Sequence, residues 1–399
     1  MITFVLLIII YLAFISLGLP DALLGVTWPI IRQEWMMRLD AAGMVSIVIT
    51  VGTIASSLLS GRLIRRFGEG KITFLSGLMT GIALLGFAYS PSYIWFVFLA
   101  LPLGFGAGSV DTALNHYVAL HFKAHHMNWL HSFWGVGATA GPILVSVILK
   151  QTGSWRLGYQ SVAIIQLILA AILFISLPLW KKHSQMTSGM EGESHGEIAS
   201  LNDRPLKIME ALKIKGVPYA LLVFMTYCAV EFSVGLWGSS YLVQIKGVSL
   251  EVAARWVAFY FGGITVGRVL AGFISFKLSN KIMIFLGVVI ALMGAILLIL
   301  VPSNSFVMIA FVLLGLGFAP IFPAMTHETP IRFGRINAQS IIGFQMASAY
   351  IGIAVFPPLL GVLMELTGMM LFPIFVLFCI LLLLYFTFKL NHSGFENSK

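Results

Sequence analysis

Three carboxylates stand inside long apolar segments of this 399-residue sequence: Asp21, Asp111 and Glu231. An ionised carboxylate within a bilayer costs roughly 3 kcal/mol on insertion scales and more in simulations. Such a group is normally retained where it faces the interior of a helix bundle or a water-filled cavity and handles a proton, a cation or a polar solute. The three positions therefore predict where the chemistry of this protein takes place.

Asp21 follows Pro20. Proline lacks a backbone donor and interrupts the hydrogen-bond ladder of a helix, so we expect a broken helix beside an acid, which suits a solute or proton site. Asp111 and Asn115 are four residues apart and share one helix face. A carboxylate accepts hydrogen bonds and an amide both donates and accepts, so this pair is suited to binding two sugar hydroxyls. The alternatives are an Asp that satisfies loosened backbone groups and a polar clasp between helices.

Arg268 is the single basic residue deep within an apolar segment, and Glu231 is its natural partner. Removing one member of a buried pair costs about 3–5 kcal/mol, so a structural ion pair would by itself explain both residues. A pair of this kind also suits a transport site, and both interpretations stay open.

Further candidates for substrate binding are aromatic or carry amide, hydroxyl or imidazole groups. His131 lies three residues before Trp134 and shares its helix face. Aromatic rings stack on the apolar faces of sugars, although interfacial belts and core packing compete as explanations. His121, His125 and His126 are expected to be solvated loop residues, and no metal site is predicted. Pro320 and Pro323 are expected to bend the tenth span, and Glu328 at its cytoplasmic end is expected to form a loop charge network with Arg332 and Arg335. The candidates are Trp28, His131, Trp134, Gln160, Trp237, Tyr241, Gln345 and Ser348.

Composition identifies the class of protein. Apolar residues make up 59% of the chain and charged residues 10%, against about 25% charged in soluble domains. The first apolar segment is too long for a cleaved signal peptide and lacks a basic leader. Both cysteines, Cys228 and Cys379, stand in apolar segments, so no disulfide or redox motif is expected. Since a membrane span needs about 20 residues, the sequence predicts an all-α integral membrane protein with twelve spans, at 4–31, 41–61, 72–90, 94–119, 128–150, 157–180, 217–244, 252–276, 282–301, 306–326, 337–363 and 369–389.

Basic residues are distributed by topology. With both termini on one side, that side carries 17 Lys and Arg residues and the other carries 6. The positive-inside rule then predicts cytoplasmic termini and a multi-pass protein of the cell's inner membrane. The net charge of +9 is thereby explained without a nucleic-acid partner.

The chain divides into two similar halves, at 1–180 and 217–399, joined by a polar cytoplasmic linker at 181–216. A shift of 211 residues superposes Gly52 on Gly263, Gly61 on Gly272, and the stretch 103–106 on 314–317. A later shift of 215 superposes Gly137 on Gly352 and Pro142 on Pro357. The pattern predicts a duplicated six-helix bundle, a layout in which transporters bind solute between the halves near the middle of the membrane.

The turn after the second span resembles the signature G-x-L-x-D-R-x-G-R-[RK] of the major facilitator superfamily. Gly61, Leu63, Arg66 and Gly68 match it, whereas Arg65 replaces the signature's Asp. Glu69 stands where a basic residue is usual, so the charge pattern of this turn is altered. With twelve spans and a duplication, the resemblance covers essentially the whole chain and implies the fold of that superfamily. It also implies a gating loop that contains Gly61, Arg62, Arg65, Arg66 and Gly68.

Three stretches resemble, more narrowly, the fucose/glucose/galactose–proton symporters and their bacterial relatives. They are 18–25 in the first span, 111–115 in the fourth and 128–135 in the fifth. The resemblance implies that spans 1, 4, 7 and 10 line a central cavity, and the three acids fall in three of those spans.

We therefore expect a secondary active transporter, not an enzyme, that imports a monosaccharide or a similar small polar solute by proton symport and alternating access. Low dielectric favours the neutral form of a carboxyl group, so Asp21 or Asp111 would carry the proton. The alternatives are a proton-coupled drug or metabolite antiporter acting as an exporter, and a sodium-coupled sugar symporter. No cofactor is expected beyond the coupling ion. The expected partners are the solute and the lipid bilayer, and the protein is expected to act as a monomer.

Overall fold

The computed structural model describes residues 2–122, 124–188, 206–300 and 304–393. Within these ranges all regular structure is helical, as hydrocarbon demands, because a helix satisfies its backbone polar groups internally. The helices are α1 (Ile2–Gly18), α2 (Leu23–Glu34), α3 (Ala41–Phe67), α4 (Glu69–Ala88), α5 (Tyr93–His121), α6 (Ala124–Thr152), α7 (Trp155–Ser188), α8 (Ile208–Ala211), α9 (Val217–Gln244), α10 (Leu250–Ile274), α11 (Asn280–Leu300), α12 (Asn304–Phe318), α13 (Ile321–Phe333), α14 (Arg335–Thr367) and α15 (Leu371–His392).

Twelve segments in the described part of the chain are long and apolar enough to cross a membrane, which confirms the predicted fold class. Several helices extend past the predicted ends. The second span, for example, continues to Phe67 through a basic last turn. Apolar character marks only the part of a helix inside the hydrocarbon, so polar ends are missed by a hydropathy criterion. In the predicted linker, 181–188 continue α7, and 189–205 lie outside the described residues.

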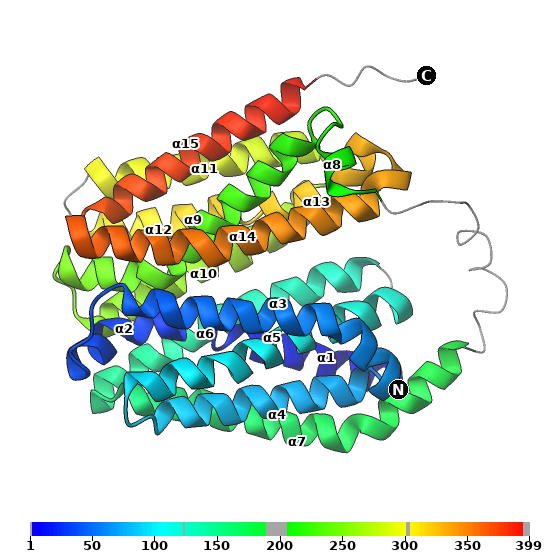
Figure 1. Ribbon diagram of the computed structural model, residues 1–399, viewed down its shortest axis with the longest axis horizontal. Helices are drawn as coiled ribbons and strands as arrows, with labels where there is room; N and C mark the ends of the chain where they lie inside the picture. The colour runs from blue at the N-terminus through cyan, green and yellow to red at the C-terminus, as the bar shows by residue number, and fades with distance from the viewer. Residues whose placement is uncertain (1, 123, 189–205, 301–303, 394–399) are drawn as a thin grey trace. The chain divides into compact units, whose positions relative to one another are not determined.

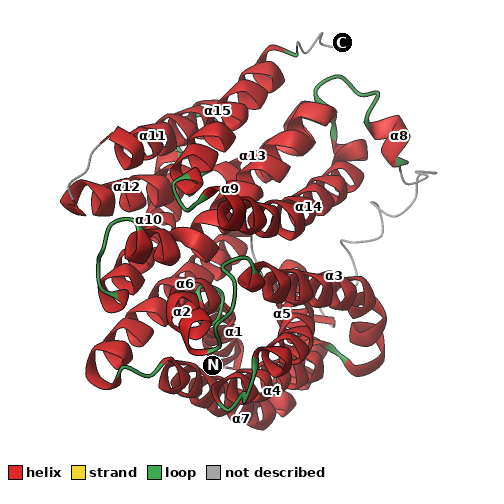
Figure 2. Ribbon diagram, turned by 60° about the vertical axis from the view of Figure 1, so that its left-hand side comes forward, coloured by secondary structure: helices red, strands yellow, loops and turns green. Residues whose placement is uncertain are grey.

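Two compact units make up the chain. Unit 1 comprises residues 1–36 and 44–202, and unit 2 comprises residues 37–43 and 203–399. The short segment 37–43 belongs with unit 2, where the Leu39 backbone N–H donates to Glu365 Oε2 at 2.8 Å. Within unit 1, α4 lies beside both α5 and α7 (Figures 1 and 2). Within unit 2, α9 lies beside α14 and α15.

Two spans are interrupted at proline. The first span breaks between Gly18 and Leu23, around Pro20, and continues as α2. The tenth span breaks between Phe318 and Ile321, and Pro320 precedes the first residue of α13. Both interruptions occur where the sequence predicts them, since proline cannot donate to the helical ladder.

One close glycine contact between helices occurs at equivalent positions of the two units. A methyl group on Gly104 would overlap the carbonyl of Ile49, and one on Gly315 would overlap the carbonyl of Tyr260. The 211-residue shift carries both residues of the first contact onto the residues of the second. Such close approaches between helix backbones are typical of membrane bundles, where small residues replace hydrophobic association.

Candidate functional site

Asp21 stands in the break between α1 and α2. Its carboxylate Oδ2 accepts a hydrogen bond of 2.6 Å from Trp134 Nε1 of α6. The residues that follow it, from Ala22 to Pro29, are buried, whereas Asp21 itself is exposed. The broken backbone therefore presents a carboxylate to open space in the middle of a long apolar segment.

Asp111 and Asn115 form the predicted pair on one face of α5. Asn115 Nδ2 donates both to the backbone oxygen of Asp111 and to its Oδ1, each at 2.9 Å. Both residues are half-buried. The contact holds the carboxylate and the amide in a fixed mutual orientation, with the remaining carboxylate oxygen and the amide oxygen available as acceptors.

The two aspartates are neighbours in unit 1. One buried cluster joins Phe14 of α1 to Val110 and Leu114 of α5, with Trp134 packed against it. Asp111 follows Val110 of this cluster directly, and Asp21 accepts from Trp134. Like charges repel each other, and a proton bound to either carboxylate would remove such repulsion.

Glu231 of α9 and Arg268 of α10 form the predicted pair in unit 2. Arg268 Nη2 lies 3.9 Å from Glu231 Oε1, and the Glu231 side chain is 7% exposed. Tyr260 Oη donates to the backbone oxygen of Glu231 at 3.1 Å. The sequence reasoning overlooked Tyr227, which precedes Glu231 by one helical turn and has a buried hydroxyl. Among the described residues, Tyr227 Oη and Glu231 Oε1 have no well-formed hydrogen bond. The signal in the sequence is the four-residue spacing between Tyr227 and Glu231, which places both side chains on one helix face.

The other unit 1 candidates lie in different surroundings. His131 meets the edge of the Phe14 ring, with centroids 5.8 Å apart, so it belongs to the same region as Asp21. Gln160 donates to Tyr89 Oη at 3.1 Å, near the first turn of α7 and the end of α4. Trp28 is fully buried and lies 6.3 Å from the Tyr93 ring between centroids.

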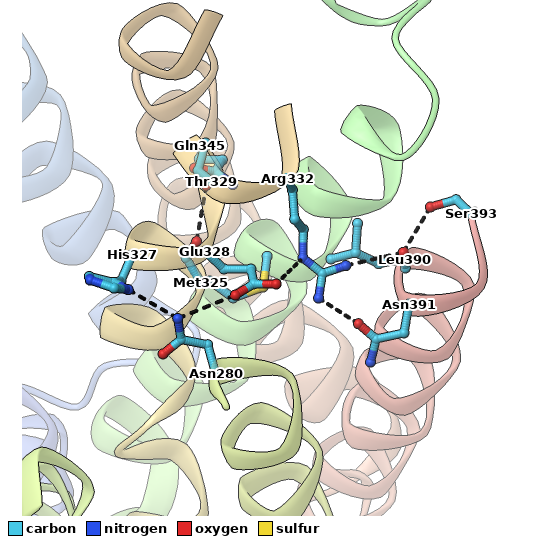
Figure 3. Close-up of polar contacts among 10 residues, drawn as sticks. All are labelled: Asn280, Met325, His327, Glu328, Thr329, Arg332, Gln345, Leu390, Asn391 and Ser393. Carbon is cyan, nitrogen blue, oxygen red and sulfur yellow. Dashed lines mark hydrogen bonds and ion pairs between the residues drawn. The ribbon is translucent and has the colours of Figure 1, made fainter. Parts of the chain in front are cut away.

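Three of the four remaining unit 2 candidates have packing partners. Trp237 is fully buried, and its Nε1 donates to the Pro357 carbonyl at 2.8 Å. The Tyr241 ring packs near Phe372. Gln345 Oε1 accepts from Thr329 Oγ1 at 3.0 Å (Figure 3). Ser348 is half-buried on α14.

Two expectations about the ends of the spans need correction. His121 and His126 do not lie in a solvated loop but on α5 and α6, half-buried; Tyr11 Oη lies 2.7 Å from His126 Nδ1, and the His121 ring contacts His183. The side chain of His125 lies outside the described residues. Glu328 and Arg332, expected in a loop charge network, are both buried on α13 (Figure 3). A hydropathy criterion predicts ends for these helices that are too early, because their terminal turns are polar.

The predicted gating loop is a single-residue turn. Gly68 connects α3 to α4 with a φ of 78°, a conformation that favours glycine. The other residues predicted in this loop lie in the last turns of α3 and are exposed: Gly61, Arg62, Arg65 and Arg66. Glu69 Oε1 lies 3.0 Å from His116 Nδ1 of α5, and the equivalent contact in unit 2 joins Asn280 to His327 at 3.0 Å.

Comparison with known proteins places this architecture in a family. The family model described as Major Facilitator Superfamily matches residues 10–335. Bypass of stop codon protein 6 of Saccharomyces cerevisiae is 27% identical over 94% of this chain and 80% of its own length. The glucose/mannose transporter GlcP of Bacillus subtilis is 23% identical over 88% of this chain and 86% of its own.

Solved structures of transporters share the fold. A bacterial homologue of the human lysosomal transporter Spinster superposes with a TM-score of 0.73 at 14% identity, over 98% of each chain. A variant of the nucleoside transporter NupG superposes with a TM-score of 0.74 at 13% identity, over 96% of this chain and 98% of its own.

Proposed function

The chain belongs to the major facilitator superfamily, and we propose that it imports a monosaccharide or a similar small polar solute by proton symport through alternating access. That it is a membrane transporter of small solutes, and not an enzyme, follows from the family. The choice of solute, ion and direction is the proposal.

The observation that carries the proposal is the group of Asp21, Trp134, Asp111 and Asn115 in unit 1. One carboxylate is exposed at a helix break with an indole N–H beside it, and the other is paired with an amide. Hydroxyl-rich solutes need acceptors and donors close together, next to a ring for their apolar faces. The same group holds two carboxylates, and neutralising one with a proton would remove a charge from the path of a neutral solute.

Alternating access needs a ligand that binds one state better than the other, since a ligand shifts an equilibrium only by its differential affinity. In a proton symporter, the carrier loaded with both proton and solute must change state more readily than the half-loaded one. A titratable carboxylate within the solute site provides this link, and Asp21 or Asp111 would serve.

Support for a sugar comes from GlcP, a relative whose name states glucose and mannose transport. A small carboxylate is the second candidate, because Arg268 places a half-buried guanidinium in unit 2. Two relatives are named for such solutes: the cis,cis-muconate transport protein of Acinetobacter baylyi and a probable sulfoacetate transporter of Cupriavidus necator.

The test is uptake by the purified protein in liposomes. Labelled hexoses, muconate and sulfoacetate are offered with an inward proton gradient, with a sodium gradient and with none. The proposal expects a hexose to accumulate only under the proton gradient. If accumulation needs sodium, the coupling ion is sodium and not a proton. If a carboxylate alone is taken up, the solute is a carboxylate and not a sugar. Proton-driven expulsion of a dye cation, without uptake of any of these solutes, would replace symport by drug antiport.

Asp21→Asn and Asp111→Asn identify the proton carrier. The carrier variant is expected to lose gradient-driven accumulation and to keep exchange of labelled for unlabelled solute, since exchange needs no net proton movement. Glu210→Gln, in the exposed helix α8, is the matched control and should retain both activities. Normal accumulation by both aspartate variants would exclude them as carriers.

A further inference from the structure

An apolar groove lies on unit 1, away from the polar group described above. Its volume is about 470 Å³, and its walls come from α3, α4 and α5. Along α4 the lining residues recur every three or four positions, which places them on one helix face. The residues that line the groove include Leu63, Phe67, Ile72, Leu75, Met79 and Ile82.

The groove has the length of one leaflet of a bilayer. From Ile72 to Ala83 it follows α4, and at 1.5 Å per residue this is about 16 Å. The hydrocarbon depth of one leaflet is about 15 Å, half of a core of about 30 Å. Its walls are mostly apolar along this length, so the groove suits an extended apolar chain.

Basic residues stand at one end of the groove, next in sequence to its lining. Arg62 precedes Leu63, Arg66 precedes Phe67, and Lys71 precedes Ile72. All three basic side chains are exposed, and so is Arg65. The Arg66 guanidinium lies 5.3 Å from the Phe67 ring centroid, so a positive charge is held beside the groove entrance.

Within the part of the chain that the structure describes, the positive charge at this entrance has no acidic partner. Among the described residues, no carboxylate forms an ion pair with Arg62, Arg65, Arg66 or Lys71. Glu69, the acidic residue in the same turn, is engaged with His116 of α5. Arg65 adds a positive charge where the superfamily signature has an acid. The cluster therefore offers several donors to an anion at the membrane surface.

We propose that this groove and its basic entrance bind an anionic phospholipid, with one acyl chain along α4 and the phosphate on Arg62, Arg66 and Lys71. The basic end lies on the side predicted to be cytoplasmic, where anionic lipid attracts basic residues by about 1 kcal/mol each. Charge and shape select the ligand together: the arginines select against a zwitterionic headgroup, and the groove selects against free phosphate.

Native mass spectrometry of the purified full chain in detergent provides the test, with phosphatidylglycerol and phosphatidylcholine added in equal amounts. Phosphatidylglycerol is expected to be retained preferentially, and less so as salt is raised. Arg62→Gln/Arg66→Gln should weaken its binding roughly 10- to 30-fold, from two lost headgroup contacts. Lys277→Gln/Lys281→Gln removes two exposed charges at the equivalent turn of unit 2 and should leave binding unchanged.

The acyl part of the site has its own variant. Leu75→Trp fills the groove at an exposed position, and Ile168→Trp places the same ring on an exposed position of α7 outside it. Only Leu75→Trp should reduce phosphatidylglycerol retention, and inorganic phosphate should not displace the lipid. Equal retention of both lipids, equal losses in the unit 1 and unit 2 charge variants, or an unaffected Leu75→Trp would each overturn the proposal.

Discussion

At the scale of single residues, the hydrogen bond from Trp134 Nε1 to Asp21 is the shortest link between a candidate carboxylate and its surroundings. A hydrogen bond to a charged group contributes about 1.5–3 kcal/mol. The bond fixes where the carboxylate points, while the helix break leaves it exposed. Losing the donor should therefore affect transport more than folding.

Trp134→Phe tests this role, since it keeps an aromatic ring and removes the N–H donor. At low solute concentration we expect uptake to fall about tenfold or more, because each 1.4 kcal/mol is a factor of ten. Initial rates in liposomes give the measurement. Trp95→Phe, at an exposed position of α5, is the control. If both variants transport normally, Asp21 does not depend on the indole.

A second residue-scale feature is the ion pair inside α13 of unit 2. Arg332 Nε lies 3.1 Å from Glu328 Oε1, and both side chains are almost fully buried. The guanidinium also donates to the Leu390 carbonyl at 3.2 Å and to Asn391 Oδ1 at 2.6 Å (Figure 3). This network ties the end of α13 to the end of α15.

Arg332→Met should destabilise the protein by about 3–5 kcal/mol, because it leaves the Glu328 carboxylate buried and without its cation. Thermal unfolding in detergent is the measurement. The double variant Glu328→Gln/Arg332→Met should be more stable than the single one, since no buried charge remains. Arg255→Met, at an exposed position of α10, should change little. If Arg332→Met is as stable as the wild type, water takes the place of the guanidinium beside the Glu328 carboxylate.

At the scale of elements, backbone contact between helices depends on glycine. A methyl group on Gly137 of α6 would overlap the Ile15 carbonyl of α1, and one on Gly352 of α14 would overlap the Met225 carbonyl of α9. These contacts hold α6 against α1, which ends three residues before Asp21, and α14 against α9, which carries Glu231.

Gly137→Ala should cost about 1–3 kcal/mol through overpacking, measured as a lower unfolding temperature, and should reduce uptake because the end of α1, and with it Asp21, is displaced. Gly272→Ala is the matched control. It lies in α10 with nothing within 4 Å of the added methyl group, and it should be neutral or stabilising by about 0.5–1 kcal/mol. The idea fails if the two variants have equal stability.

At the scale of the whole molecule, the distribution of basic residues predicts orientation. Cys228 and Cys379 are buried, so the wild type should not react with a membrane-impermeant maleimide. Lys150→Cys and Lys281→Cys each place a thiol at an exposed position, on opposite sides of the predicted topology. In intact cells we expect labelling of Lys150→Cys alone, and of Lys281→Cys only after permeabilisation. The reverse pattern would invert the topology.

Much of the molecule follows from patterns along the chain. Apolar length determines the twelve spans, because hydrocarbon accepts only helices of sufficient length. Pro20 and Pro320 determine the two breaks, and the spacing of glycines indicates the duplication. Three acids in apolar segments identify the candidate site, because burying a charge without a purpose is too costly to persist.

Other features depend on the tertiary structure. Hydropathy could not reveal that Trp134 donates to Asp21, or that Trp237 donates to the Pro357 carbonyl. It also could not separate the buried Arg332 from the exposed Arg62. The local pattern determines that a residue belongs to a helix and how deep it lies, whereas its partners are set by which helix faces meet. Those meetings bring together residues more than 100 positions apart, as with Asp21 and Trp134, and so leave no periodic trace in the sequence.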